Sequence, residues 1–274
     1  MVNASLPAPS DAPMSEPHGA GRAPVRVHLD MDLAAGAAIQ APAEIAHYLR
    51  NVMRLRQGDA VLAFNSRDGE WRAEISGMAK RAVTLSLQAQ TRPPSPPPDL
   101  WLLFAPIKKA RTDFIVEKAC ELGCRRVLPV ITERTQTARV RADRLRAHAI
   151  EAAEQCGTVF VPEVVEAAPL RAVLEGWPPD RALHFCDETR QARPMIEQAA
   201  PPPAAILIGP VGGFSLDEAR ALRAAPFVRP VALGPRILRA DTAAAAAIAL
   251  WQAAQGDWSA AAPEACLDSG EAPA

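Results

Sequence analysis

The chain has 274 residues, of which 49% are hydrophobic, and this provides enough apolar surface for one or two domains with substantial cores. Such a size and composition exclude a peptide hormone and a fully disordered protein. The formal net charge is only −1, but residues 20–150 carry 21 Lys or Arg against 13 Asp or Glu, whereas residues 151–274 carry 9 against 16. The basic front half favours contact with a polyanion, and the alternative is a solvated basic face without a ligand.

Both ends of the chain are predicted to be disordered tails. Residues 1–24 are rich in Ala, Pro and Ser and have no Lys or Arg before Arg22, so they lack the basic start and apolar core of a signal peptide. Residues 257–274 form the second tail. The sequence predicts no transmembrane helix. Its five cysteines include no CxxC pair, which favours reduced thiols in a cytoplasmic protein, and no metal site is predicted.

Residues 25–91 are predicted to form a small β-barrel domain. Four strand patterns run through it, namely VRVHLD, DAVLAFN, GEWRAEI and AVTLSLQAQ, and Asn65 to Gly69 have the composition of a hairpin turn. A helix over 42–54, with Pro42 in its first turn, interrupts the strands. Residues 92–99, RPPSPPPD, are expected to be a stiff extended linker that marks a domain boundary.

Residues 100–256 alternate between strand and helix patterns. The expected strands are 100–106, 126–132, 182–186, 205–209 and 231–234, and the expected helices are 112–123, 140–156, 216–225 and 242–255. This alternation indicates an α/β domain with a mainly parallel sheet.

A glycine-rich stretch, ILIGPVGGFS (206–215), lies between a predicted strand and a predicted helix. The strand ends at Gly209, and Ser215 and Glu218 have the spacing of a capping box at a helix start. The loop is therefore expected at the carboxyl end of a strand, where open α/β sheets bind their ligands. It matches neither GxGxxG nor a P-loop, so phosphate binding is not supported, and a purely structural turn is the alternative.

A second stretch, VALGPRILRADT (231–242), repeats this arrangement. A strand is followed by a Gly-Pro turn, by the apolar pair Ile237 and Leu238, and by charged residues at the start of an Ala-rich helix. Because two such units occur about twenty residues apart, a purely structural role for the glycine loop becomes less favoured.

Together with other motifs, these loops resemble the RsmE family of SPOUT RNA methyltransferases. The resemblance covers roughly residues 25–255 in the family's order. Its motifs are HYLRNVMRLRQGDAV (47–61), KKARTDFIVEKACELGCRRVLPVITERT (108–135), EAAEQCG (151–157), LIGPVGGFSLDE (207–218) and LGPRILRADTAA (233–244). Several ordered motifs are far more specific than a single glycine loop.

The resemblance implies both a fold and an activity. The expected fold is a PUA-like β-barrel followed by an α/β SPOUT methyltransferase domain with a carboxyl-terminal trefoil knot. The expected activity is S-adenosylmethionine-dependent methylation of N3 of a uridine in bacterial 16S ribosomal RNA, within the 30S subunit. A homodimer is also implied, because the helix 243–254, with Ile248, Leu250 and Trp251, resembles the element that packs across a two-fold axis. An ordinary core helix is the alternative.

A cofactor wall follows from the same resemblance. In the family, the backbone of two glycine-containing loops encloses S-adenosylmethionine. Because glycine has no side chain, the main chain can approach the cofactor closely there. The residues implied are Leu207, Gly209, Pro210, Gly212, Gly213, Leu233, Gly234, Ile237, Leu238 and Thr242.

Two residues at the start of the last helix are candidates for catalysis. N3 of uracil carries a proton at neutral pH, so its loss must be assisted or the resulting charge stabilised. Arg239 is expected to face the uracil or a neighbouring phosphate, and a surface arginine is the alternative. Asp241 occupies the place of a family glutamate and is a candidate proton acceptor or relay, with a helix N-cap as the alternative.

RNA is the expected partner, whereas DNA and membranes are not. Phosphate contacts are predicted for Arg50, Arg54, Arg56, Lys108, Lys109, Arg111, Arg134 and Arg139. Glu154 and Gln155 match a family motif and are second-rank site candidates. His47 and Tyr48 either contact RNA or pack on the apolar face of their helix.

Four positions depart from the family pattern. Val211 stands where the family has Glu, Ala240 and Ala243 where it has Thr, and Thr158 where it has Arg. These departures keep open a ribosome-assembly or RNA-binding factor without catalysis. A further alternative is another SPOUT enzyme acting on transfer RNA, which the PUA-like front half and the motif order disfavour.

Overall fold

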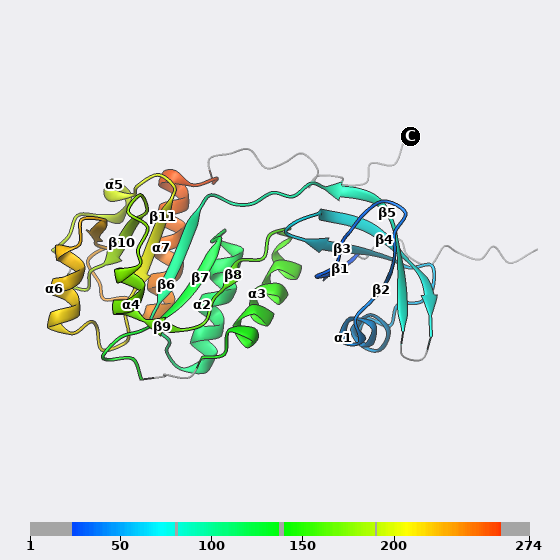
Figure 1. Cartoon of the computed structure of the whole chain (residues 1–274), viewed down its shortest axis with the longest axis horizontal. Helices are drawn as coiled ribbons and strands as arrows, with labels where there is room; N and C mark the ends of the chain where they lie inside the picture. The colour runs from blue at the N-terminus through cyan, green and yellow to red at the C-terminus, as the bar shows by residue number, and fades with distance from the viewer. Residues whose placement is uncertain (1–23, 80–81, 137–139, 190, 259–274) are drawn as a thin grey trace, which may run out of the picture.

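The computed structural model describes residues 24–79, 82–136, 140–189 and 191–258. The predicted tails 1–24 and 257–274 therefore lie almost entirely outside the described residues. Figure 1 shows a smaller β unit, in blue and cyan, and a larger α/β unit, in green to red, joined by an extended segment. Within the described ranges, no helix is both long enough and apolar enough to cross a membrane.

A five-stranded sheet forms the smaller unit, in the order β1-β3-β4-β5-β2. Its strands are β1 (Val25–His28), β2 (Ala38–Gln40), β3 (Ala60–Asn65), β4 (Gly69–Met78) and β5 (Val83–Arg92). The predicted hairpin turn joins β3 and β4, and it requires glycine at its end. Gly69 has φ +78°, and a Cβ there would lie 2.2 Å from the carbonyl oxygen of Arg92.

The predicted helix over 42–54 is shorter and less regular than its pattern indicates. Helix α1 covers Ala43–His47, and a single π-helical turn, η1, follows over Tyr48–Val52. Arg54 then adopts φ 57°, and no other non-glycine residue in the described part of the chain has a positive φ. The wide turn places the fully buried Leu49 in the barrel core, and its carbonyl accepts the N–H of Leu55.

A parallel sheet forms the larger unit, in the order β12-β10-β11-β6-β7-β8, with β9 paired to β7. Its strands are β6 (Leu100–Phe104), β7 (Arg126–Ile131), β8 (Glu163–Val164), β9 (Ala168–Pro169), β10 (Ala182–Cys186), β11 (Ala204–Ile208) and β12 (Val228–Val231). The expected strand 231–234 is thus displaced: β12 ends at Val231, and the residues after it form a loop. The predicted parallel α/β fold is confirmed.

Helices cover both faces of this sheet (Figure 1). They are α2 (Lys109–Glu121), α3 (Ala142–Cys156), α4 (Leu170–Glu175), α5 (Met195–Gln198), α6 (Leu216–Ala224) and α7 (Ala240–Gln255). On one face, α2, α3 and α7 bury Leu102 and Ile206, and on the other α4 and α6 bury Leu103 and Leu207. This alternation along β6 and β11 follows from the two-residue period of a strand.

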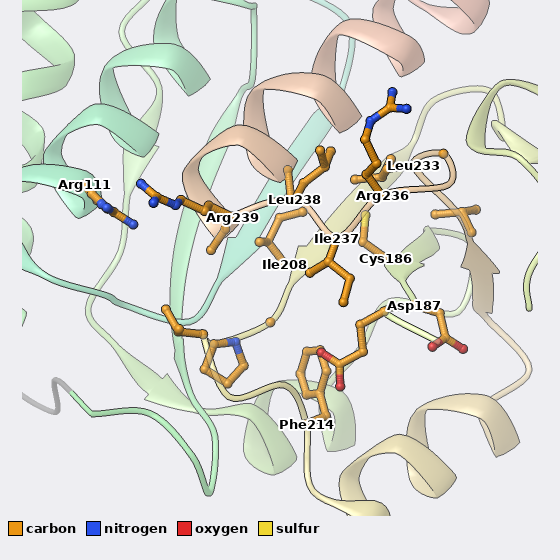
Figure 2. Close-up of a pocket in the computed structure, with 18 residues that line it drawn as sticks. Arg111, Cys186, Asp187, Ile208, Phe214, Leu233, Arg236, Ile237, Leu238 and Arg239 are labelled. Carbon is orange, nitrogen blue, oxygen red and sulfur yellow. The ribbon is translucent and has the colours of Figure 1, made fainter. Parts of the chain in front are cut away.

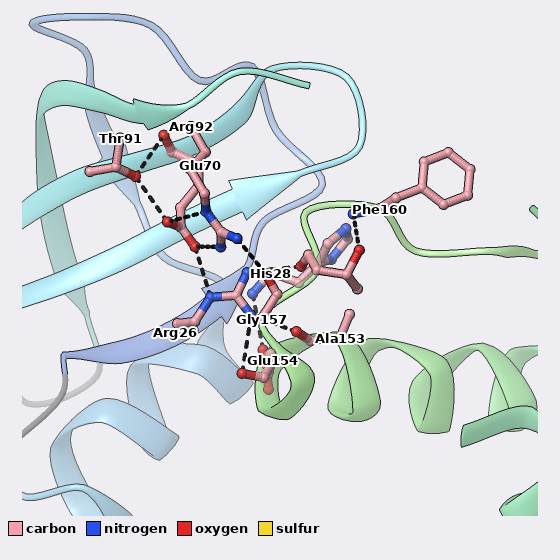
Figure 3. Close-up of polar contacts among 10 residues, drawn as sticks. Arg26, His28, Glu70, Thr91, Arg92, Ala153, Glu154, Gly157 and Phe160 are labelled. Atoms are coloured by element: carbon pink, nitrogen blue, oxygen red, sulfur yellow. Dashed lines mark hydrogen bonds and ion pairs between the residues drawn. The ribbon is translucent and has the colours of Figure 1, made fainter. Parts of the chain in front are cut away.

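An arginine–glutamate–arginine cluster joins the two units at the carboxyl end of α3 (Figure 3). Glu70 accepts hydrogen bonds from Arg26 Nε at 2.7 Å and from Arg92 Nε at 3.0 Å. Arg92 Nη2 also donates to the Glu70 carboxylate. The other three guanidinium nitrogens donate to main-chain carbonyls of Ala153, Glu154, Gly157 and Thr158. Because the last carbonyls of a helix have no partner within the helix, the barrel supplies the donors that α3 lacks.

Glu70 neutralises the charges of Arg26 and Arg92 while it is almost fully buried, since only 4% of its side chain is exposed. Burial opposes ionisation of this carboxyl, but hydrogen bonds from Arg92 and Arg26 outweigh burial and hold its pKa below the ordinary value. Its contribution to stability is therefore present above the ordinary carboxyl pKa and is lost as the pH falls through the lowered one.

We predict that Glu70→Gln destabilises the protein by about 3 kcal/mol at neutral pH, because two largely buried arginines lose their counter-charge. The measurement is the free energy of unfolding in urea. Glu175→Gln is the control: it breaks the exposed pair of Glu175 with Arg171, and the expected loss is at most ~0.5 kcal/mol. The difference between wild type and Glu70→Gln should shrink in acid. A difference that grows in acid would contradict this assignment.

Candidate functional site

A cavity of about 290 Å³ opens at the carboxyl edge of the parallel sheet (Figure 2). Its walls come from the loops that follow β10, β11 and β12 and from the start of α7. The lining residues include Ile208, Val231, Leu233, Leu238 and Phe214, which make much of the wall apolar. The volume lies near the lower end of the range for cavities that bind small molecules.

The glycines after β11 make room for neighbouring side chains of the protein. A Cβ on Gly209 would lie 2.6 Å from the Phe214 ring, which packs edge-on against Phe185. At Gly213, where φ is +69°, a Cβ would lie 2.0 Å from a carboxylate oxygen of Glu188. Phe214 and Glu188 both line the cavity, so these glycines shape its wall by admitting the two side chains.

The helix after this loop begins as predicted. Ser215 Oγ accepts the N–H of Glu218, and the Glu218 carboxylate accepts the N–H of Ser215, which is a complete capping box. In the loop after β12, Gly234 has φ +107° and open space around it. Glycine there is required by the backbone conformation and not by contact.

Six of the ten residues in the predicted cofactor wall line the cavity. They are Gly209, Pro210, Leu233, Gly234, Ile237 and Leu238. The other four lie elsewhere: Leu207 is fully buried in the sheet core, Gly212 lies beside Arg134, Gly213 lies behind Glu188, and Thr242 is exposed on α7. A strand alternates between faces, so Ile208 and not Leu207 points to the cavity side.

Two acidic residues that sequence reasoning missed follow β10 directly. Asp187 and Glu188 line the cavity, and Asp187 accepts two hydrogen bonds from Arg223, at 2.7 and 3.2 Å. Burial works against ionisation of Asp187, but Arg223 and Thr189 outweigh it and lower its pKa. The sequence feature that could have identified these two residues was their position directly after a predicted parallel strand, at its carboxyl end.

Arg239 and Asp241 lie at the start of α7, where Arg239 lines the cavity and Asp241 does not. Arg239 is the N-cap, so the N-cap alternative for Asp241 is wrong, because the helix begins at Ala240. Asp241 Oδ2 lies 3.6 Å from Arg111 Nε. Arg111 and Arg239 both line the cavity, and Figure 2 shows them on the same side of it.

The predicted phosphate-binding residues fall into two groups in the structure. The first group, on or just after the barrel helix formed by α1 and η1, consists of Arg50, Arg54 and Arg56. Arg50 donates to the carbonyl of Ala79. Lys108, Lys109 and Arg111 begin α2, and Arg134 donates to the carbonyl of Gly212 at 2.8 Å. Of this second group, Arg111 lines the cavity, whereas Lys108, Lys109 and Arg134 are not among its lining residues. Arg139 lies outside the described residues.

The four residues that depart from the family pattern lie in two different places in the structure. Val211, Ala240 and Ala243 line the cavity, and Val211 is 73% exposed. Thr158 lies at the junction of the two units, where its carbonyl accepts a hydrogen bond from Arg26. Glu154 lies there too, and its carboxylate accepts the N–H of His28 at 3.0 Å. The EAAEQCG motif thus contributes to the junction between the units.

We predict that Gly213→Ala destabilises the protein by at least about 1–2 kcal/mol, because a left-handed residue gains a Cβ that overlaps Glu188. Gly212→Ala is the matched control. Its Cβ would have no atom nearer than 3.8 Å and its φ is not positive, so the change should stay within ~0.5 kcal/mol. Thermal unfolding of both variants checks this. Equal losses would contradict the requirement for glycine at position 213.

Two family models match the chain, one over each unit. A model of the RNA methyltransferase domain family matches residues 94–252, and a model of the RNA methyltransferase PUA domain matches residues 42–88. Ribosomal RNA small subunit methyltransferase E of Rickettsia conorii is 29% identical over 229 residues, which cover 82% of this chain and 93% of the relative. The Synechocystis protein of the same name is 30% identical over 212 residues, with coverages of 74% and 69%.

Solved structures are similar over most of the chain. Ribosomal RNA small subunit methyltransferase E from Neisseria gonorrhoeae, bound to S-adenosyl methionine, has a TM-score of 0.78 and 27% identity, and covers 86% of this chain and 99% of its own. A methyltransferase from Legionella pneumophila with bound cofactor has a TM-score of 0.77 and 28% identity, with coverages of 85% and 99%. The chain therefore belongs to the RNA methyltransferase domain family, in the group named ribosomal RNA small subunit methyltransferase E.

Proposed function

We propose that this protein transfers a methyl group from S-adenosylmethionine to N3 of a uridine in 16S ribosomal RNA of the small ribosomal subunit, in the cytoplasm. The observation that carries the proposal is the cavity at the carboxyl edge of the parallel sheet, bounded by both glycine loops and flanked by arginines. Family membership supplies the class of reaction, and the pairing of a PUA domain with a methyltransferase domain supports RNA as the substrate.

The cavity suits the cofactor in shape and charge. Leu233, Leu238 and Phe214 offer apolar surface to an adenine ring, and the main chain at Gly234 has open space beside it. The carboxylate of Glu188 is of the right sign for a positively charged ligand. When bound, S-adenosylmethionine supplies a methyl group on a positively charged sulfur, so alignment with the acceptor nitrogen is the main requirement.

Arg239 is proposed as the catalytic residue that stabilises negative charge on the uracil as N3 loses its proton. It is exposed, lines the cavity, and stands at the positive end of α7, where an anion is favoured. A guanidinium has donors in a planar fork that suit a uracil oxygen or a phosphate.

Asp241 is proposed to position Arg111. This role replaces the role of proton acceptor or relay that the sequence suggested for Asp241. The two side chains form an ion pair, and the Asp241 side chain is 18% exposed against 40% for Arg111. This ion pair keeps the Arg111 guanidinium beside the cavity. Two arginines, Arg111 and Arg239, then face the developing charge.

The test of the function uses small ribosomal subunits from a strain that lacks the host enzyme. We expect labelled methyl groups to appear at N3 of one uridine in 16S ribosomal RNA when the protein and labelled cofactor are added. Absence of that label would refute the proposal. Label on free transfer RNA would instead support the transfer RNA alternative. Absence of both methylation and cofactor binding in calorimetry would support an RNA-binding factor without catalysis, because such a factor need not bind S-adenosylmethionine.

We predict that Arg239→Ala lowers turnover roughly 100-fold, because it removes a donor to charge that forms in the transition state. Its affinity for S-adenosylmethionine should stay near that of wild type. Arg220→Ala is the control, since Arg220 is a largely exposed arginine on α6 with only a surface partner. Loss of both turnover and cofactor affinity would assign Arg239 to the cofactor wall.

A double-mutant cycle separates the two roles of Asp241. If Asp241 acts through Arg111, Asp241→Asn lowers turnover in the wild-type background but has little further effect in Arg111→Ala. If Asp241 is the proton acceptor, Asp241→Asn lowers turnover by the same factor in both backgrounds and changes the pH profile of turnover. The second outcome would overturn the positioning role.

A homodimer is proposed from apolar side chains at the cavity mouth. Ile237 and Val211 are 78% and 73% exposed, on the two loops that line the cavity. Two of the three helix residues expected at the two-fold, Ile248 and Trp251, are instead fully buried in the core of their own chain. Light scattering should therefore show a dimer that Ile237→Asp weakens, whereas a monomeric wild type would refute it.

A further inference from the structure

The barrel carries a second hollow, away from the cofactor cavity. It lies between the barrel helix and the β4–β5 hairpin and has a volume of about 200 Å³. Ala43, Ala46 and Val83 contribute small apolar surfaces, and His47, Arg50 and Asn51 contribute polar groups. We call these six residues the barrel hollow. Its size suits one ring-sized group better than a larger organic ligand.

An unusual backbone forms one side of the barrel hollow. The π-helical turn Tyr48–Val52 continues α1, and Arg54 follows with φ 57°. Single π turns within helices are frequent at functional sites, and a non-glycine residue in the left-handed region is strained. The turn brings His47, Arg50 and Asn51 to one cavity. Arg50 is held there by a hydrogen bond to the carbonyl of Ala79, at 3.1 Å.

The chemistry of the barrel hollow favours a nucleotide. None of its described lining residues is acidic, and Arg54 and Arg56 follow it directly in the chain. Asn51 offers an amide that both donates and accepts hydrogen bonds, which suits the edge of a base. Arg50 suits a phosphate, and the alanine floor leaves room for a planar ring.

We propose that the barrel hollow binds one unpaired nucleotide of the substrate RNA, with its base inside and its phosphate at Arg50. This inference rests on the proposed function for the identity of the RNA. It gives the barrel a role in fixing the register of the RNA. The barrel is anchored to the catalytic unit through Arg26, Arg92 and Glu70, so a nucleotide held in the hollow also constrains where the target uridine lies.

The test fills the hollow and leaves the cofactor cavity untouched. Ala43→Trp places an indole in the hollow from an exposed position of α1, and Glu44→Trp places the same ring on the next residue, which does not line the hollow. Filter binding with unmethylated small ribosomal subunits measures affinity without requiring methyl transfer. We expect roughly tenfold weaker binding for Ala43→Trp, the effect of losing one base contact, and no change for Glu44→Trp.

Asn51→Ala is the second variant, because Asn51 is exposed and its truncation leaves the core intact. It should also weaken binding of subunits, with unchanged calorimetric affinity for S-adenosylmethionine. Wild-type affinity in both Ala43→Trp and Asn51→Ala would overturn the proposal, as would equal weakening by Glu44→Trp. If Ala43→Trp and Asn51→Ala weaken binding of a peptide pool to the protein but leave subunit binding unchanged, the hollow is assigned to a protein partner. Failure of the methylation assay with intact subunit binding would refute only the proposed function.

Discussion

The parallel pairing of β10 with both β11 and β12 is the constraint on which the rest of the site depends. Parallel strands end at the same edge of a sheet, so the loops after Cys186, Ile208 and Val231 must meet there. These loops are separated in sequence, yet they form one cavity with the first turn of α7. Arg239 then stands beside Arg111 because α7 and α2 pack on the same face of the sheet.

Close packing sets the shape of that cavity. The glycines of the first loop admit the Phe214 ring and the Glu188 carboxylate, and these two side chains form the wall. The interpretation that glycine serves only to bring backbone to a cofactor is therefore incomplete. At Gly209 and Gly213 the atoms that leave no room for a Cβ belong to the protein itself, whereas at Gly234 the backbone angle decides.

The junction between the units explains a motif that the cofactor cavity does not. Glu154 and Thr158 contact the barrel, and Arg26 and Arg92 supply donors to the last carbonyls of α3. Glu70 neutralises both arginines at a place largely shielded from water. A fixed orientation of the barrel matters for an enzyme that acts on a large RNA, because contacts far from the reacting base then help to align it.

The sequence by itself determined the parallel α/β fold, the β-barrel and the capping box at Ser215, because periodicity and turn residues are local properties. The predicted site residues that do line the cavity, such as Gly209, Leu238 and Arg239, were expected from the family resemblance and not from local patterns. Only the tertiary structure decided that Leu207 is core, that Arg239 occupies the N-cap position of α7, and that Asp241 pairs with Arg111. It also revealed Asp187 and Glu188 in the cavity and the π turn of the barrel helix. These features depend on contacts between segments far apart in the chain, which no local pattern encodes.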